Sequence, residues 1–300
     1  MSRLRAAVLI PAADYPEDHG WAFDSQAAAL ENAGINVVAR CWTDPAVEGG
    51  VDLVLPLTAW GYHARLPEWL TLLDRLEATP AVTLNPVALL RWNSDKAYLA
   101  ELADVGVATV PTIAVAALDD AALATARARF QATELVIKPP VSAAADGTYR
   151  LGLNDPVPIA VAGQRMLIQP FQRAIALRGE LSLMIFGGEY SHAIVKYPKS
   201  GDFRVQPHLG GRDEPVEAPQ EAIALAHAAL AAAPAAAAYA RVDMIANEQG
   251  QWQIMELELI EPALWLPRAP GSAERFANAV RAHAEQILAQ RGGQVRHPGR

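Results

Sequence analysis

The N-terminal third of the chain alternates short apolar runs with longer helical stretches, and this alternation constrains the fold more than any other feature. Residues 6–10 (AAVLI) are continuously apolar, as is typical of a strand covered on both faces. A helix is predicted over 21–33, ending at Gly34, because glycine readily adopts the left-handed conformation that follows many helices. The same pattern continues with strands at 36–42, 51–57 and 81–85 and a helix at 67–77. Alternating strands and helices predict a doubly wound parallel sheet, an α/β domain over residues 1–92.

The sequence pattern of the rest of the chain predicts two α+β units. The smaller unit, 93–175, is expected to open with a helix capped by Asn93 or Ser94. The larger unit, 176–290, has longer strands arranged as hairpins, and residues 291–300 are expected to form a loose tail. The further predicted elements are strands at 110–115, 134–140, 165–171, 179–198, 239–246 and 252–260 and helices at 119–130, 219–233 and 272–290.

Charge and composition exclude several classes of protein. The net charge of −8 gives no basic face for nucleic acid, so no nucleic-acid partner is expected. Cys41 is the single cysteine, which excludes an internal disulfide framework and favours the cytoplasm. No stretch approaches the ~20 apolar residues of a membrane span. The apolar run before Pro11 is also shorter than the ~7 residues of a secretory signal.

Three carboxylates and an arginine are predicted to share one face of the last hairpin. Side chains at i and i+2 of a strand share a face, so Glu256 and Glu258 point one way and Met255 the other. With a four-residue turn at 247–250, Asp243 lies opposite Ile254 and Arg241 lies opposite Glu256. Buried carboxylates need a cation, and hard divalent ions prefer oxygen ligands. The sequence therefore favours a site for two Mg²⁺ ions, with Mn²⁺ as an alternative; the competing interpretation is a solvent-exposed charged face.

Two lysines and a loop of small residues precede this hairpin. Lys96 is expected on the first turn of a helix, and Lys138 ends an apolar strand. Residues 142–148 (SAAADGT), here called the small-residue loop, would let backbone N–H groups approach a polyphosphate. There is no Walker sequence and no GxGxxG sequence, so neither of those phosphate-binding devices is present. Each lysine taken alone is more simply a surface residue, and the order of the motifs carries the argument.

That order resembles the ATP-grasp superfamily, close to its glutathione-synthetase-like and D-alanine–D-alanine-ligase-like members, from about Asn93 to Leu266. The resemblance implies an ATP-grasp fold in which the predicted parallel sheet precedes a small lid subdomain and a large antiparallel-sheet subdomain. It implies nucleotide-binding roles for Lys96, Lys138, Ser142, Gln169, Pro170 and Phe171. It implies catalytic roles for Lys196, Arg204, Arg212 and Arg241. It implies metal-binding roles for Asp243, Glu256 and Glu258.

The chain also departs from the family pattern. Glu258 stands where many members have asparagine, and Gln206 stands where asparagine is common. Lys196 occupies a position where an arginine often precedes the proline. The sequence from Glu256 to Pro262 (ELELIEP) resembles a group that includes D-cycloserine-forming enzymes, which close a ring within one substrate.

The resemblance implies an ATP-dependent carboxylate–amine ligase that works through an acyl-phosphate and releases ADP and phosphate. The expected partners are small-molecule acids and amines, without a membrane or nucleic acid. A small-molecule kinase and a non-catalytic nucleotide-binding protein remain as alternatives. Ligation between two substrates, ring closure and a homo-oligomer are all left open. His63, in the sequence WGYH, is assigned either to the substrate cleft or to packing within its loop, and Glu261 is taken as structural.

Overall fold

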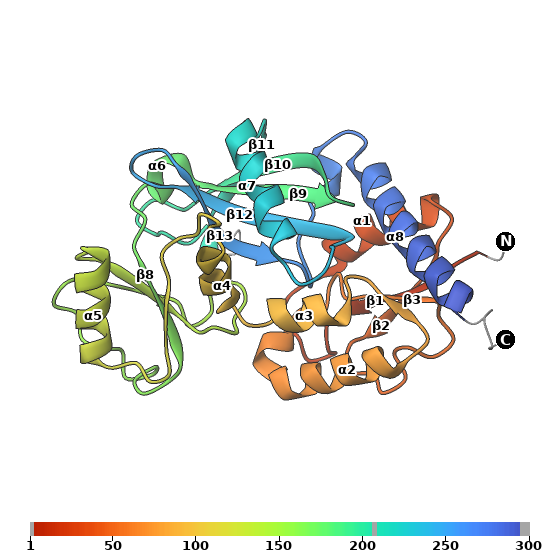
Figure 1. The fold of residues 1–300 in the computed structure, drawn as a ribbon, viewed down its shortest axis with the longest axis horizontal. Coiled ribbons are helices and arrows are strands. Elements are labelled where there is room, and N and C mark those ends of the chain that lie inside the picture. Colours follow the sequence, from red (N-terminus) through yellow and green to blue (C-terminus); the bar gives the residue numbers. More distant parts are fainter. Residues whose placement is uncertain (1–2, 206–208, 295–300) are drawn as a thin grey trace.

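The computed structural model describes residues 3–205 and 209–294, and the chain folds around three sheets (Figure 1). The first is the predicted parallel sheet, with strand order β2-β1-β3-β4. Its elements are β1 (Arg5–Ile10), α1 (Gly20–Asn32), β2 (Asn36–Cys41), β3 (Leu53–Leu55), the 3-10 helix η1 (Tyr62–Arg65), α2 (Leu66–Ala78), β4 (Val82–Thr83) and α3 (Val87–Asn93). Among the described helices, none is both long and apolar enough to cross a bilayer.

Strand β1 is buried on both faces, as its continuous apolar sequence predicts. Ala6 and Val8 pack into one core together with residues of α1 and α8 (Ser272–Gln294). Ala7 and Leu9 pack into a second core with α2, including Trp69. All four side chains are fully buried, which confirms the doubly wound arrangement.

The second sheet is smaller and has a core of its own. Its strand order is β5-β8-β6-β7, with antiparallel pairing, and α5 packs against it. Its elements are β5 (Ile113–Val115), α5 (Asp120–Phe130), β6 (Leu135–Lys138), β7 (Tyr149–Leu151) and β8 (Met166–Pro170). The sequence did not predict β7, because three residues with one exposed arginine carry no clear period.

The third sheet carries the long hairpins in the order β11-β10-β9-β12-β13. Its strands are β9 (Glu180–Phe186), β10 (Glu189–Tyr197), β11 (Arg212–Val216), β12 (Tyr239–Ala246) and β13 (Trp252–Glu258). The associated helices are α6 (Ile175–Arg178), α7 (Gln220–Ala231), the 3-10 helix η3 (Leu266–Arg268) and α8. Helix α8 continues to Gln294, beyond the end predicted at residue 290, and residues 295–300 of the expected tail lie outside the described residues.

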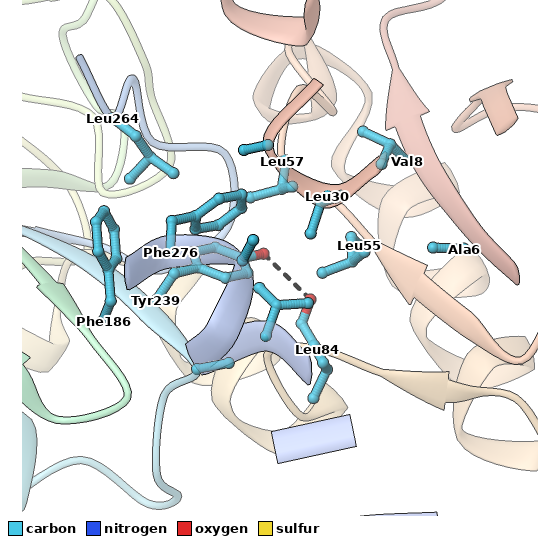
Figure 2. Packing of buried hydrophobic residues seen from close by; sticks show 14 of the residues in the cluster. Ala6, Val8, Leu30, Leu55, Leu57, Leu84, Phe186, Tyr239, Leu264 and Phe276 are labelled. Carbon is cyan, nitrogen blue, oxygen red and sulfur yellow. Dashed lines mark hydrogen bonds between the residues drawn. The ribbon is translucent and has the colours of Figure 1, made fainter. Parts of the chain in front are cut away.

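The first and third sheets share one hydrophobic core (Figure 2). Leu55 and Leu84 of the N-terminal sheet pack in this core with Phe276 of α8. Tyr239, which begins β12, donates its hydroxyl to the Leu84 carbonyl at 3.1 Å and lies 3.2 Å from the Ile260 carbonyl. The two sheets are therefore joined by apolar packing as well as by hydrogen bonds.

The prediction that a helix starts at Asn93 or Ser94 is wrong. Helix α3 ends at Asn93, and the next helix, α4, spans Tyr98–Asp104, so Lys96 lies in the turn between them. The Asn93 side chain does not cap a helix. It donates to the Leu257 carbonyl at 2.8 Å and accepts from the Leu259 N–H at 2.9 Å, which fixes the outer edge of β13.

Candidate active site

One pocket lies between the second and third sheets, and it contains every predicted site residue except Arg212. Strands β6 and β8 supply one wall, and β9, β10, β12 and β13 supply the other. The N-terminal domain contributes Tyr62 from η1. Segments that are far apart in the sequence thus meet around one cavity, in the place where the motif order predicted a binding site.

The β12–β13 hairpin has a different register from the one predicted. Asp243 lies opposite Glu256, and Arg241 lies opposite Glu258. The turn accounts for a shift of one residue. Ala246 pairs with Trp252, so five residues lie between them instead of the predicted four. The second shift comes from a β-bulge, where the pairing changes between Asp243 and Met244. Together the two shifts change the pairing by two residues. Because side chains two residues apart share a face of a strand, the carboxylates still share a face.

The bulge also changes the position of Met255. The sequence predicted that Met255 would point away from Glu256, but both residues line the pocket. Met255 packs there beside Phe171 and Phe203 in a small cluster around Ile245. An extra residue in one strand interrupts the strict alternation of faces, which a period-two pattern cannot anticipate.

Arg241 holds two of the predicted metal ligands. Its Nε donates to Asp243 Oδ1 and its Nη2 donates to Asp243 Oδ2, each at 2.9 Å. Nη2 also pairs with Glu258. Burial alone would raise the pKa of Asp243, but Arg241 and Lys196 hold it well below its usual range. Burial raises the pKa of Glu258, although Arg241 opposes the shift.

Lys196 extends this network to a residue that sequence reasoning missed. Its Nζ lies 3.3 Å from Asp243 Oδ2 and also pairs with Glu180, the first residue of β9. Both side chains of this second pair are more than nine-tenths buried. The signal for Glu180 was available, since a charged residue opening an otherwise apolar strand needs a buried partner.

Lys96 connects the turn after α3 to the small-residue loop and to β13. Its Nζ lies 3.2 Å from Glu256 Oε1 and donates to the Ser142 carbonyl. Its backbone N–H donates to the Pro140 carbonyl at 2.7 Å. Lys96 therefore holds the loop close to the carboxylate wall.

Lys138 has no such partner. Its side chain is buried in the pocket, and no carboxylate of the described residues forms an ion pair with it. Burial lowers its pKa to about 8, with Glu256 opposing and Lys96 adding to the shift. An unpaired buried ammonium at the end of a strand is suited to an anion such as phosphate.

The other end of the pocket is flat and partly apolar. Gln169, Pro170 and Phe171 line it, and Gln169 donates to the Thr112 hydroxyl at 2.9 Å. The Phe171 ring lies edge-on to Phe203, with 5.8 Å between centroids. An aromatic and amide wall of this kind suits a planar base.

The two remaining predicted arginines differ in position. Arg204 lines the pocket and pairs with Asp202 at 2.9 Å. Arg212 is exposed at the start of β11, pairs with Glu214 at 3.3 Å and stacks on the Tyr197 ring. The pocket does not include Arg212, because β11 is an edge strand that carries it outward. Gln206 lies outside the described residues.

Glu261, which the sequence analysis took as structural, lines the pocket on the side of the N-terminal domain. The Trp60 indole donates to its carbonyl at 3.2 Å. Burial and the nearby Glu258 raise the pKa of Glu261 to about 8. His63 is half-buried and edge-on to Tyr62, and it is not part of the pocket wall, which fits packing within its loop.

Among residues 3–205 and 209–294, no three acidic or histidine side chains converge as a preassembled metal cage. Asp243, Glu256 and Glu258 instead face one cavity while paired with cationic side chains. Mg²⁺ commonly binds through one or two carboxylates together with phosphate oxygens and water, so a complete protein cage is not required. The donor set fits Mg²⁺ bound together with a nucleotide.

Comparisons with known proteins identify similar chains. A family profile described as "D-cycloserine synthetase DcsG, N-terminal domain" matches residues 5–85. The cycloserine biosynthesis protein DcsG of Streptomyces lavendulae is 33% identical over 278 residues, covering 84% of this chain and 90% of that protein. The crystal structure of D-cycloserine synthetase DcsG is similar with a TM-score of 0.81 and 28% identity, covering 93% of this chain and 99% of that one.

The fold is shared more widely. D-alanine–D-alanine ligase of Bacillus anthracis, solved in complex with ATP, has a TM-score of 0.70 at 17% identity, covering 98% of this chain and 100% of that one. Solved structures of this fold contain ATP, or Mg with ADP, which supports ATP and Mg²⁺ as the cofactors. The expected fold is therefore confirmed, as is the expected class of enzyme, an ATP-dependent carbon–nitrogen ligase. The chain belongs to the ATP-grasp ligases, in the group that contains D-cycloserine synthetase.

Proposed function

We propose that this ligase closes a ring within one small amino-acid-like substrate, joining its carboxylate to its own amine as a cyclic amide. The single observation that carries the proposal is the pocket that combines unpaired Lys138, the paired carboxylates of β13 and a wall from the N-terminal domain. The similarity to a cycloserine synthetase along most of both chains favours ring closure over ligation of two substrates. On this basis, residues 1–92 supply the substrate side, 93–175 the lid and 176–290 the metal side.

The residue roles follow from the charges. Lys96 and Lys138 neutralise phosphate oxygens of ATP, and Gln169, Pro170 and Phe171 hold the base. Ser142, whose carbonyl already accepts from Lys96, joins the loop that covers the phosphates. With the loop closed, water is excluded from the acyl-phosphate.

Asp243, Glu256 and Glu258 would hold two Mg²⁺ ions, or Mn²⁺ in their place. The metal would supply positive charge to the β- and γ-phosphate oxygens when bound. Arg241 and Lys196 hold Asp243 in place before ligands arrive, and Arg241 also holds Glu258.

The proposed reaction has two steps. The substrate carboxylate takes the γ-phosphoryl group from ATP, releasing ADP and forming an acyl-phosphate. The amine of the same molecule attacks the acyl carbon, phosphate leaves, and the amine loses a proton. Nη1 of Arg241 makes no hydrogen bond within the part of the chain that the structure describes, so it can donate to the oxyanion. Arg204, which also lines the pocket, is assigned the same role.

Product mass tests this proposal. The enzyme, ATP and Mg²⁺ should convert an amino acid carrying a second amine into a product lighter by one water, with one ADP for each ring. Glu256→Gln should abolish turnover, while Glu248→Gln in the exposed turn of the same hairpin leaves it unchanged. ADP with a stable phosphorylated product would establish a kinase instead. A product that combines two substrates would establish an intermolecular ligase.

A further inference from the structure

Almost every charged side chain that lines the pocket has a partner of opposite charge. Lys96 pairs with Glu256, and Arg241 pairs with both Asp243 and Glu258. Two further pairs complete the set: Lys196 with Glu180, and Arg204 with Asp202.

Two lining residues are exceptions among the described part of the chain. Lys138 has no ion pair and no side-chain hydrogen bond, and the Glu261 carboxyl forms neither with another residue. When ionised, the two groups carry charges of opposite sign. Since a charge removed from water needs compensation, each is suited to a ligand group of the opposite charge.

The two exceptions lie on different sides of the pocket. Lys138 ends β6 of the second sheet, on the side assigned to the nucleotide. Glu261 follows β13 and is fastened to the N-terminal domain by the hydrogen bond from Trp60. ATP carries no cationic group at neutral pH, so an organic cation that meets Glu261 belongs to the second ligand.

Aromatic residues surround this carboxylate. Tyr62 lines the pocket, and Tyr15 lies beside Trp60 with 6.3 Å between ring centroids. Burial raises the pKa of both tyrosine phenols, and Glu261 adds to the shift. A carboxylate among aromatic rings is a common environment for an ammonium group, which pairs with the former and is attracted to the faces of the latter.

We propose that Glu261 binds a primary ammonium group of the substrate that stays free through ring closure. The inference rests on the proposed function and assigns the residue that recognises such an amine. Holding that amine as an ammonium ion removes its lone pair, so it cannot compete with the amine that closes the ring. Glu261 is thereby a specificity residue and not a metal ligand.

The test compares two ring compounds that differ in this amine. D-cycloserine carries a free primary amine, and isoxazolidin-3-one is the same ring without it. Calorimetry with saturating ADP and Mg²⁺ should show that the wild-type enzyme prefers D-cycloserine by at least about tenfold, as expected for one charged hydrogen-bonded pair. Glu261→Gln should reduce this preference to less than about threefold, and Glu261→Asp should keep part of it.

Controls separate this role from others. Glu248→Gln, a matched change on the exposed turn of the hairpin, should keep the full preference. Glu261→Gln should retain the increase in melting temperature that ATP and Mg²⁺ give the wild type. Loss of that increase would assign Glu261 to metal binding and overturn the proposal.

The outcomes also distinguish this proposal from the proposed function. An unchanged preference in Glu261→Gln, or no preference in the wild type, overturns the ammonium site even if ring closure occurs. Conversely, a wild type that never forms a product lighter by one water removes the proposed function. A preference that depends on Glu261 would still stand in that case, because calorimetry requires no turnover.

Discussion

Lys138 has a different environment from the other lysines of the pocket, because it is buried without a carboxylate partner. Burial lowers its pKa from 10.5 to about 8, so the unfolded chain keeps the proton to higher pH than the folded chain does. The wild-type free energy of unfolding should therefore gain from this residue as pH rises from about 8 to about 10.5, by up to about 3 kcal/mol.

Lys138→Met should remove that gain. Urea denaturation of both proteins across this pH range should show the variant more stable at pH 7 and the difference shrinking as pH rises. The variant should also bind ATP about tenfold to a hundredfold more weakly, since one charged contact with phosphate is lost. Parallel pH profiles for the two proteins would contradict the account of a buried, unpaired ammonium.

Residue types and spacing predicted most of the side chains that line the pocket, although Arg212 lies outside it, but they did not predict how these side chains are paired. Asn93 was expected to cap a helix and instead fixes the edge of β13, a contact between positions 164 residues apart. Glu180 and Glu261 were not predicted to face the pocket, because a lone acidic residue in an apolar segment identifies no partner. Pairings of this kind depend on tertiary packing, which local pattern does not contain.

At the scale of elements, the small-residue loop depends on Gly147. This residue has a φ of +66°, and a Cβ there would lie 2.7 Å from the ring of Pro139. Ala144 and Ala145 also adopt positive φ, so the loop already holds two residues in a conformation costly for a side chain.

Gly147→Ala should therefore weaken ATP binding at least about tenfold, because the loop cannot keep its path over the phosphates. Gly163→Ala is the matched control, since Gly163 has a φ of +73° and open space around it. Both variants should lose about 1 kcal/mol of stability from backbone strain. Titration with ATP and Mg²⁺ checks the prediction, and equal affinities in the two variants would refute it.

The β12–β13 hairpin shows how far an element could be predicted. The alternation of apolar and charged residues identified both strands and their shared carboxylate face. It did not predict the five-residue connection or the bulge, and so the partners of Asp243 and Arg241 were each wrong by two positions. Turn length and bulges are decided by local hydrogen bonds, such as the Gln251 N–H donating to the Asn247 side chain at 2.9 Å.

At the scale of the whole molecule, the pocket draws on the N-terminal domain and on the second and third sheets, so its ligands should stabilise the entire chain. Saturation with ATP and Mg²⁺ should add about 2.7 kcal/mol to the free energy of unfolding at a hundred times Kd. A thermal scan measures this as an increase in melting temperature. Adenosine with Mg²⁺ should give a much smaller increase, and equal increases for the two ligands would contradict phosphate binding by the lysines.

The overall architecture was the most predictable level. Periodic apolar segments identified the parallel sheet and the long hairpins. The burial of β1 on both faces follows directly from its unbroken apolar sequence. The core shared by the first and third sheets could not be predicted, because nothing in residues 5–85 indicates which later segment covers them.

That shared core has a consequence for synthesis on the ribosome. Tyr239 lies 155 residues after Leu84, the N-terminal residue to which its hydroxyl binds. Synthesis adds about 5–20 residues per second, so roughly 8–30 seconds pass between the synthesis of Leu84 and that of Tyr239. Until then one apolar face of the sheet is uncovered, which makes the half-finished chain, rather than the mature enzyme, the state most in need of a chaperone.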